Sequence, residues 1–133
     1  ERNNYEELCQ AACGLLSRYS GAYCLESFDP RCIYWLKKNR PEMIRGQLTE
    51  NYFASASCKL PWILKFVLRH QLLNFLTLPD FVAYRYRDRK TPSNFFCRRF
   101  WNLQGVAWTI KNRREYDEAV SEGWIPIFEG FRP

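Results

Sequence analysis

The sequence predicts an α/β fold in which helices alternate with strands along a parallel sheet. Short apolar segments typical of strands are separated by longer segments with helical signals, and this order recurs five times along the chain. Proline and cap residues mark where several of the helices begin. Parallel neighbours need a crossover connection, so this order favours a parallel sheet covered by helices.

Helix boundaries are clear in the first part of the chain. A capping box of Asn4 and Glu7 opens an amphipathic helix, and Gly21 follows it as a stop signal. Asp29 precedes a proline at the first helical position, which predicts a second helix over residues 30–39. Strands are expected over residues 22–27 and 43–48.

The middle of the chain contains a loop and the most apolar segment. Residues 49–59 form the longest irregular stretch, and long loops on α/β scaffolds often cover functional sites. Residues 61–76 are shorter than the ~20 residues that a membrane-spanning helix needs. Lys65, Arg69 and His70 also interrupt the segment, so it predicts a core helix and no membrane span.

The last part of the chain repeats the same signals. Thr91 before a proline predicts a third helix start, and Asn112 with Glu115 forms another capping box. The expected elements are a strand over 80–86, a helix over 93–102, a strand over 105–110, a helix that Gly123 closes and a strand over 125–128. No linker or low-complexity tract divides the chain, so residues 1–133 are expected to form a single domain.

Composition favours a packed core. The chain is 47% hydrophobic and 17% aromatic, well above the range of disordered proteins. Its net charge of +6 suits phosphate-bearing partners, and residues 85–90 beside Tyr84 are the best nucleic-acid candidate. No nucleic-acid-binding motif accompanies them, so no nucleic-acid partner is expected.

The six cysteines do not form a recognisable framework. Cys9 and Cys13 lie one turn apart on the first expected helix, Cys24 falls in an expected strand, and no Cys-x-x-Cys pair occurs. With one histidine in the chain, we expect no zinc site. Buried or half-buried reduced thiols, and therefore a cytoplasmic location, are the interpretation we favour.

Candidate site residues lie where the expected strands end. Glu26 can meet a metal or a substrate hydroxyl, or bond to a neighbouring loop. Trp108 is suited to an apolar substrate wall or to a packed layer of the core. Gln47 is placed to point into the mouth of the sheet, and Glu129 follows the last strand. Arg45 can bind phosphate through its planar donor fork, or pair with one of the two glutamates.

Several short motifs, in order and spacing, resemble the closing half of the glycerophosphodiester phosphodiesterase family. They are Ser-Phe-Asp-Pro at 27–30, Arg-Gly-Gln-Leu at 45–48, Pro-Asp-Phe at 79–81, Trp-Thr-Ile at 108–110 and the final Arg-Pro. The resemblance implies the C-terminal portion, about five strands, of a TIM-type (β/α)8 barrel. The family's His-Arg-Gly opening, its Glu-x-Asp strand and its second catalytic histidine have no counterpart here.

The resemblance implies a phosphoric diester hydrolase that converts a glycerophosphodiester and water to sn-glycerol 3-phosphate and an alcohol. In the family a divalent cation, Mg or Ca, assists two histidines. Those residues lie in the opening strands, so no catalytic residue, metal ligand or cofactor is assigned to this chain. What remains is the substrate-side wall, with Trp108, Glu26 and Gln47. Glu129 stands where the family usually has Thr-Asp.

The sequence leaves two hypotheses for the function. In the first, the chain pairs with a missing N-terminal half that carries the catalytic groups, and the chain alone is inactive. In the second, it is a non-catalytic half-barrel that binds or assembles, forming a homodimer through its open sheet edges.

Overall fold

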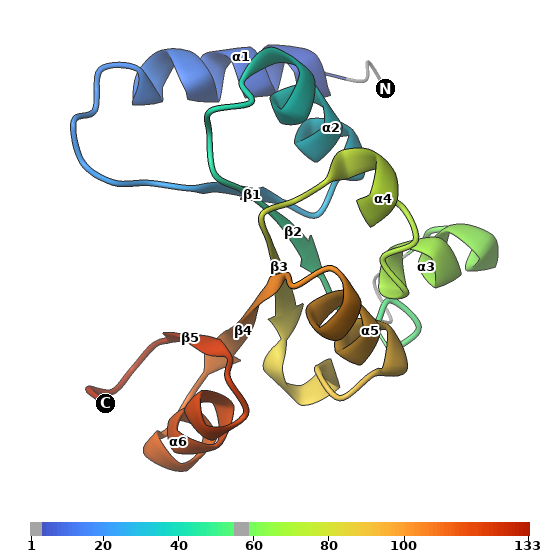
Figure 1. Cartoon of the computed structure of the whole chain (residues 1–133), viewed down its shortest axis with the longest axis vertical. Helices are drawn as coiled ribbons and strands as arrows, with labels where there is room; N and C mark the ends of the chain where they lie inside the picture. Colours follow the sequence, from blue (N-terminus) through green and yellow to red (C-terminus); the bar gives the residue numbers. More distant parts are fainter. Residues whose placement is uncertain (1–3, 55–58) are drawn as a thin grey trace.

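The computed structural model describes residues 4–54 and 59–133 and contains one sheet of five parallel strands in the order β1-β2-β3-β4-β5. The strands are β1 (Leu25–Ser27), β2 (Arg45–Thr49), β3 (Phe81–Arg85), β4 (Gln104–Ile110) and β5 (Ile125–Phe128). The α-helices are α1 (Tyr5–Leu16), α2 (Pro30–Asn39), α3 (Trp62–Arg69), α4 (Asn74–Thr77), α5 (Pro92–Phe100) and α6 (Arg113–Ser121), with a 3-10 turn η1 (Tyr86–Asp88). The described helices lie around one side of the sheet, and the other side is open (Figure 1). The predicted alternating parallel α/β fold is confirmed.

Three helix starts follow the predicted capping chemistry. The side chains of Asp29, Thr91 and Asn112 each accept a hydrogen bond from a backbone N–H in the first helical turn, at 2.9, 3.3 and 3.0 Å. The cap predicted at Asn4 is wrong, since its side chain makes no such bond and α1 begins without it. The extended backbone of Asp29 and Thr91 explains why a proline can follow each of them.

The helix predicted over residues 61–76 is wrong in extent and in burial. The chain forms α3 and α4 instead, because Gln71 between them adopts a positive φ of 55° that breaks the helix. Its side-chain amide is buried and donates to Asn94 of α5. No residue of α3 is buried, and Trp62 at its start is 70% exposed.

The sheet has a helix-covered face and an open, concave face. On the concave face a buried cluster of Phe81, Ala83 and Val106 packs with Leu48 and Trp108. Two other buried clusters involve the helices. One lies beside α1 and α2, and its members include Ile33 and Leu36, while the other lies beside α6 and includes Tyr84 and Trp124.

Gly46 makes the concave packing possible. A Cβ atom at this position would lie 2.1 Å from the aromatic ring of Phe81 on the neighbouring strand. The missing side chain therefore lets the Phe81 ring lie against the backbone of β2, and any larger residue at Gly46 would displace it.

The described cysteines are free thiols. Cys9, Cys13, Cys32 and Cys97 are buried, whereas Cys24 is exposed and precedes β1 rather than lying in it. Strand β1 is shorter than predicted because its ladder with β2 begins only at Leu25, which pairs with Arg45. The burial expected of the thiols is therefore wrong for Cys24, and Cys58 lies outside the described residues.

Candidate functional site

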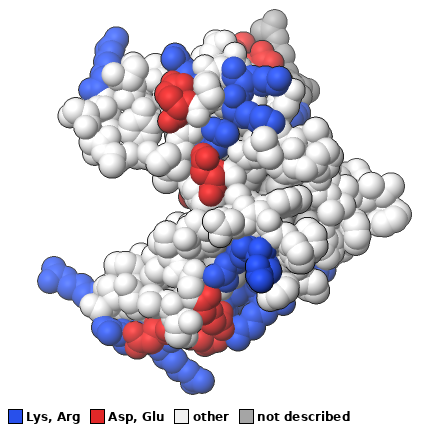
Figure 2. Space-filling model, in the orientation of Figure 1, with Lys and Arg blue, Asp and Glu red and all other residues white. Residues whose placement is uncertain are grey.

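The molecule is hollowed on one side (Figure 2). Because the five strands are parallel, their carboxyl ends lie at one edge of the sheet. Leu48 and Ala83 belong to the concave cluster, and side chains two positions apart on a strand share a face. The same face therefore carries Glu50, just after β2, and Arg85, at the end of β3. Trp108 and Phe28 complete this edge, from β4 and from the segment after β1.

Trp108 forms an apolar wall across the concave face. Its ring centroid lies 5.7 Å from that of Phe28, with the two rings nearly perpendicular at 86°. Such edge contacts contribute about 0.5–1.5 kcal/mol beyond burial of area. The buried indole Nε1 has no hydrogen-bond acceptor in the described part of the chain. Trp108 thus combines an apolar surface with one free donor.

Glu26 lies in the middle of β1, opposite Gly46 on β2. Its side chain has no hydrogen bond or ion pair with any of residues 4–54 and 59–133. Partial desolvation raises the pKa of this carboxyl above its usual range. The absence of a fixed partner leaves both carboxylate oxygens able to accept hydrogen bonds from a ligand.

Gln47 is buried at 5% exposure and ties β2 to the end of β1. Its Nε2 donates to the carbonyl oxygens of Ser27 at 3.0 Å, Phe28 at 3.2 Å and Leu48 at 3.0 Å. The side chain therefore fixes the turn that carries Phe28 rather than projecting freely into the mouth of the sheet.

Arg45 lies at the opposite, amino end of the sheet. Its guanidinium donates to the carbonyl oxygens of Pro41 and Met43 at 3.3 Å and of Leu78 at 3.1 Å. Its acidic neighbour is Asp80, 3.8 Å away, and not either of the glutamates considered as partners. The structure does not bring Arg45 to the carboxyl edge.

Glu129 follows β5 and forms an exposed ion pair with Lys111, which follows β4. Its backbone N–H also donates to the carbonyl of Ile110 at 3.1 Å. Both side chains are more than half exposed, at 64% and 56%. This ion pair therefore links the ends of β4 and β5 but contributes little to the free energy of unfolding.

The ion pair of Glu50 and Arg85 is a feature that the sequence analysis missed. The Arg85 Nη1 lies 3.1 Å from the Glu50 Oε2, across the ends of β2 and β3. A signal was available, since each residue stands two positions after an apolar residue of the concave cluster. The sequence pattern alone does not say which face of the sheet each strand end meets, and it places Glu50 in the expected loop over residues 49–59.

Most of the basic cluster at residues 85–90 is paired with acids. Arg89 is 5% exposed and lies 2.8 Å from Glu118 on α6 and 2.8 Å from Glu122 just after it. Lys90 contacts the same two carboxylates. These contacts attach the segment after β3 to α6.

The described residues do not fit a divalent cation. Within residues 4–54 and 59–133 no group of three or more His, Cys, Asp or Glu side chains is placed to hold a metal ion. Of the two carboxylates at the mouth, Glu50 is paired with Arg85 and Glu26 stands apart. His70 lies at the end of α3, against Phe66 and Ser93.

No helix in the described part is long and apolar enough to cross a membrane.

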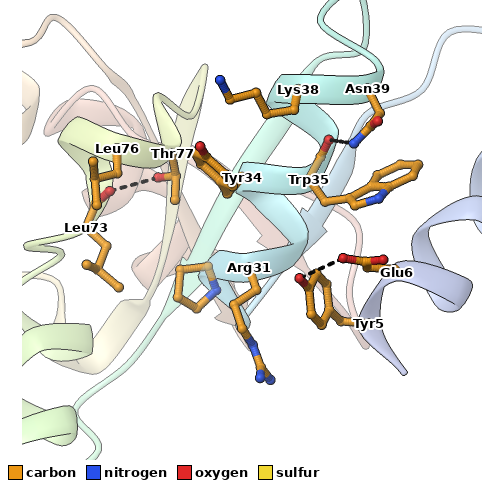
Figure 3. Close-up of a pocket in the computed structure, with 11 residues that line it drawn as sticks. Tyr5, Glu6, Arg31, Tyr34, Trp35, Lys38, Asn39, Leu73, Leu76 and Thr77 are labelled. Carbon is orange, nitrogen blue, oxygen red and sulfur yellow. Dashed lines mark hydrogen bonds between the residues drawn. The ribbon is translucent and has the colours of Figure 1, made fainter. Parts of the chain in front are cut away.

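A groove of about 470 Å³ lies on the helix side, between α1, α2 and α4 (Figure 3). Its polar groups are engaged locally, since Arg31 pairs with Asp29 at 2.6 Å and the Tyr5 hydroxyl donates to Glu6. None of the predicted site residues lines it. We interpret this groove as the space left where α1, α2 and α4 pack side by side, and not as a functional site.

Solved structures with the same arrangement of elements are phosphodiesterases. One is a phosphodiesterase from Oleispira antarctica in complex with the product sn-glycerol-3-phosphate, with a TM-score of 0.68 and 14% identity. Another is a glycerophosphodiester phosphodiesterase from Parabacteroides distasonis, with a TM-score of 0.66 and 11% identity. The chain has part of their fold. The alignments cover 96% and 94% of this chain but only 47% of each neighbour.

The chain therefore spans about half the length of the structures that it resembles. Its parallel strands and outer helices correspond to a partial TIM-type barrel, which confirms the predicted fold class. A scan of family models and a search of curated proteins found no match to the sequence.

Proposed function

We propose that this chain forms the substrate-side part of a phosphoric diester hydrolase that cleaves glycerophosphodiesters to sn-glycerol 3-phosphate and an alcohol. The observation that carries the proposal is the edge formed by Trp108, Phe28 and the Glu50–Arg85 pair, with Glu26 two residues before Phe28 on β1. It lies at the carboxyl ends of parallel strands, where α/β barrels bind their substrates. The fold shared with phosphodiesterases supports the reaction class.

Each residue at this edge has a role suited to its chemistry. Trp108 and Phe28 would contact the apolar part of the alcohol or glycerol group. Glu26 would accept a hydrogen bond from a substrate hydroxyl, since its carboxylate has no competing partner among the described residues. Arg85, oriented by Glu50, would direct its remaining N–H donors to phosphate oxygens. Gln47 is a positioning residue that holds the turn before Phe28.

The acid–base groups and the metal ligands are proposed to come from outside the described residues. A divalent cation, Mg or Ca, would neutralise charge on the phosphoryl group. Its ligands would belong to the same outside residues, because no three acidic, histidine or cysteine side chains of the described part converge to hold a metal ion.

The test is hydrolysis of a panel of glycerophosphodiesters, with Mg²⁺ or Ca²⁺, by the longer protein that this proposal requires. Trp108→Ala should lower kcat/KM by about 10- to 100-fold, because it removes the apolar wall. Trp101→Ala is the matched control, since this half-exposed tryptophan lies at the end of α5, outside the barrel. A longer protein that is inert toward the whole panel would contradict the proposal.

A second candidate function rests on the open edges of the sheet. Strand β5 pairs only with β4 in the described structure, and its Ile125, Ile127 and Phe128 are 52%, 40% and 41% exposed. Unpaired apolar edges favour pairing with another strand, so this candidate is a non-catalytic half-barrel that dimerises edge to edge.

Two measurements separate the candidates. A denaturing mass of 16.0 kDa for the native protein would favour the half-barrel, whereas about twice that mass is what a complete barrel needs. Sedimentation equilibrium of the chain with Ile127→Lys, which places a charge on β5, should then show loss of the dimer. A chain that is already monomeric without the substitution would exclude edge pairing.

A further inference from the structure

The helices α3, α4 and α5 present an unusual number of exposed apolar side chains. We call these five residues the outer aromatic face: Trp62, Ile63, Phe66, Phe75 and Phe96, which are 70%, 59%, 46%, 60% and 49% exposed. The three helices lie on the same side of the molecule (Figure 1), and few charged side chains cover the right-hand part of the surface, where α3 projects (Figure 2). Contiguous apolar surface of this kind marks interaction sites in soluble proteins.

A groove joins the three helices into one surface. It has a volume of about 640 Å³ and lies between α3 and α4 on one side and α5 on the other. Phe66 and Phe75 line one wall, and Phe96 and Trp101 line the other. The His70 ring packs on Phe66 with its centroid 4.5 Å away, which continues the apolar lining.

Completion of a barrel would not cover this face. Additional strands would pair with the open edges at β1 and β5, because β2, β3 and β4 already have neighbours on both sides. Helices α3 and α4 connect β2 to β3, and α5 connects β3 to β4. Thr49 and Tyr84 bond to carbonyls at the end of α3, which fixes this helix over the central strands. The outer aromatic face therefore needs another occupant.

The charges around the face indicate which occupant it suits. Residues 59–79 and 91–103 contain no Asp or Glu, while they contain Lys59, Lys65, Arg69, Arg98 and Arg99. Arg98 is directed to the carbonyls of Glu122 and Gly123 on the other side of α5, so the basic side chains of α3 and the segment before it carry the charge argument. Tryptophan and phenylalanine beside lysine and arginine are typical of helices that lie in a membrane interface. Basic residues near such a surface are attracted to anionic lipid headgroups.

We propose that the outer aromatic face docks on an anionic lipid bilayer. The side chains of Trp62 and Phe66 enter the headgroup region, and Lys59 and Lys65 contact anionic headgroups. The chain lies on the surface and does not span it. A second copy of the chain, which would have to meet the same basic surface, is disfavoured by charge repulsion.

The test is flotation of the chain with vesicles of phosphatidylcholine alone and of phosphatidylcholine with phosphatidylglycerol. The chain should bind the anionic vesicles, and salt should weaken this binding. Trp62→Ser with Phe66→Ser should lower the partition coefficient by about tenfold or more, because burial of either side chain contributes at least a factor of this size.

The matched control is Leu8→Ser with Leu15→Ser on α1, two leucines that are 65% and 75% exposed away from this face. This control should bind vesicles like the unchanged chain. The proposal fails if anionic vesicles do not bind the chain, or if both double variants lose binding equally. It also fails if the chain is a dimer in gel filtration that only the Trp62 and Phe66 variant dissociates, since the occupant would then be a second copy.

Discussion

Replacement of Gln47 by leucine tests whether the side chain of Gln47 holds the end of β1 and the backbone of Phe28 in place. Leucine has nearly the same volume, so the substitution leaves little cavity and mainly removes the donors of Nε2. These donors serve three carbonyl oxygens at 3.0–3.2 Å. Because Nε2 carries two hydrogens, about two full hydrogen bonds are lost, at about 1–1.5 kcal/mol each. We expect a loss of about 2–3 kcal/mol in the free energy of unfolding.

The assay is urea and thermal unfolding of the chain, followed by circular dichroism. A loss of this size corresponds to a fall in Tm of about 6–12 °C for a chain of this length. Gln104→Leu is the control, since Gln104 is exposed and donates mainly to the carbonyl of its neighbour Gly105. We expect the control to stay within about 0.5 kcal/mol of the unchanged chain.

Gln47→Glu tests the same contacts through the dependence of stability on pH. A carboxylate at this buried position would face three carbonyl oxygens and have no donor to offer them. Its pKa would be raised, so the penalty is present near neutral pH and is relieved as the pH falls through that raised pKa. The reasoning is refuted if Gln47→Leu unfolds like the unchanged chain, or if Gln47→Glu is no less stable than Gln47→Leu at neutral pH.

Three further predictions concern the contacts that hold α6. Arg89→Met should lower the free energy of unfolding in urea by about 2–3 kcal/mol, because it breaks two ion pairs of a buried guanidinium. The control Arg113→Met, at an exposed ion pair, should lower it by under about 0.5 kcal/mol. Equal effects of the two variants would contradict this prediction. Asn112→Ala should cost about 1 kcal/mol and Asn4→Ala almost nothing, since the Asn112 side chain accepts a hydrogen bond from its helix and the Asn4 side chain does not. A reversed order in thermal unfolding would count against the capping assignment. The hydrogen bond from Tyr86, followed by those from Lys90 and Arg89, lowers the pKa of Glu118 from its ordinary value of 4.5 to about 2. The stabilisation is present above the unfolded pKa and is lost as the pH falls from about 4.5 toward 2, so Glu118→Gln should flatten the dependence of stability on pH in that interval.

The order of elements could be predicted because each helix start carries local chemistry. Asp29, Thr91 and Asn112 act through bonds to their own helices, so no tertiary contact was needed to find them. The break after α3 could not be found in this way. It depends on the buried amide of Gln71 and its partner Asn94, which is 23 residues away in the sequence.

The candidate site was predicted less completely because the faces of the strands were not known. A shift of one position along a strand moves a side chain to the other face. Gln47 shares its face with Thr49, whose hydroxyl bonds to the carbonyl of Leu68 on the helix side. Glu50 and Arg85 lie an even number of positions from Leu48 and Ala83, so their side chains share the concave face with these two residues. Leu48 and Ala83 are apolar neighbours that identify this face only once the packing is known.

The same limit explains why the apolar segment after β2 was assigned to the core. Hydrophobic content shows how much apolar surface a chain has, but not which part of it is covered. The concave cluster is built from short strand segments, while α3, the helix with no buried residue, carries Trp62, Ile63 and Phe66 on the surface. Because no residue of α3 is buried, packing against the rest of the fold contributes little hydrophobic stabilisation to this helix. Its composition is therefore better explained by a surface that it meets outside the protein, which is what the vesicle experiment measures.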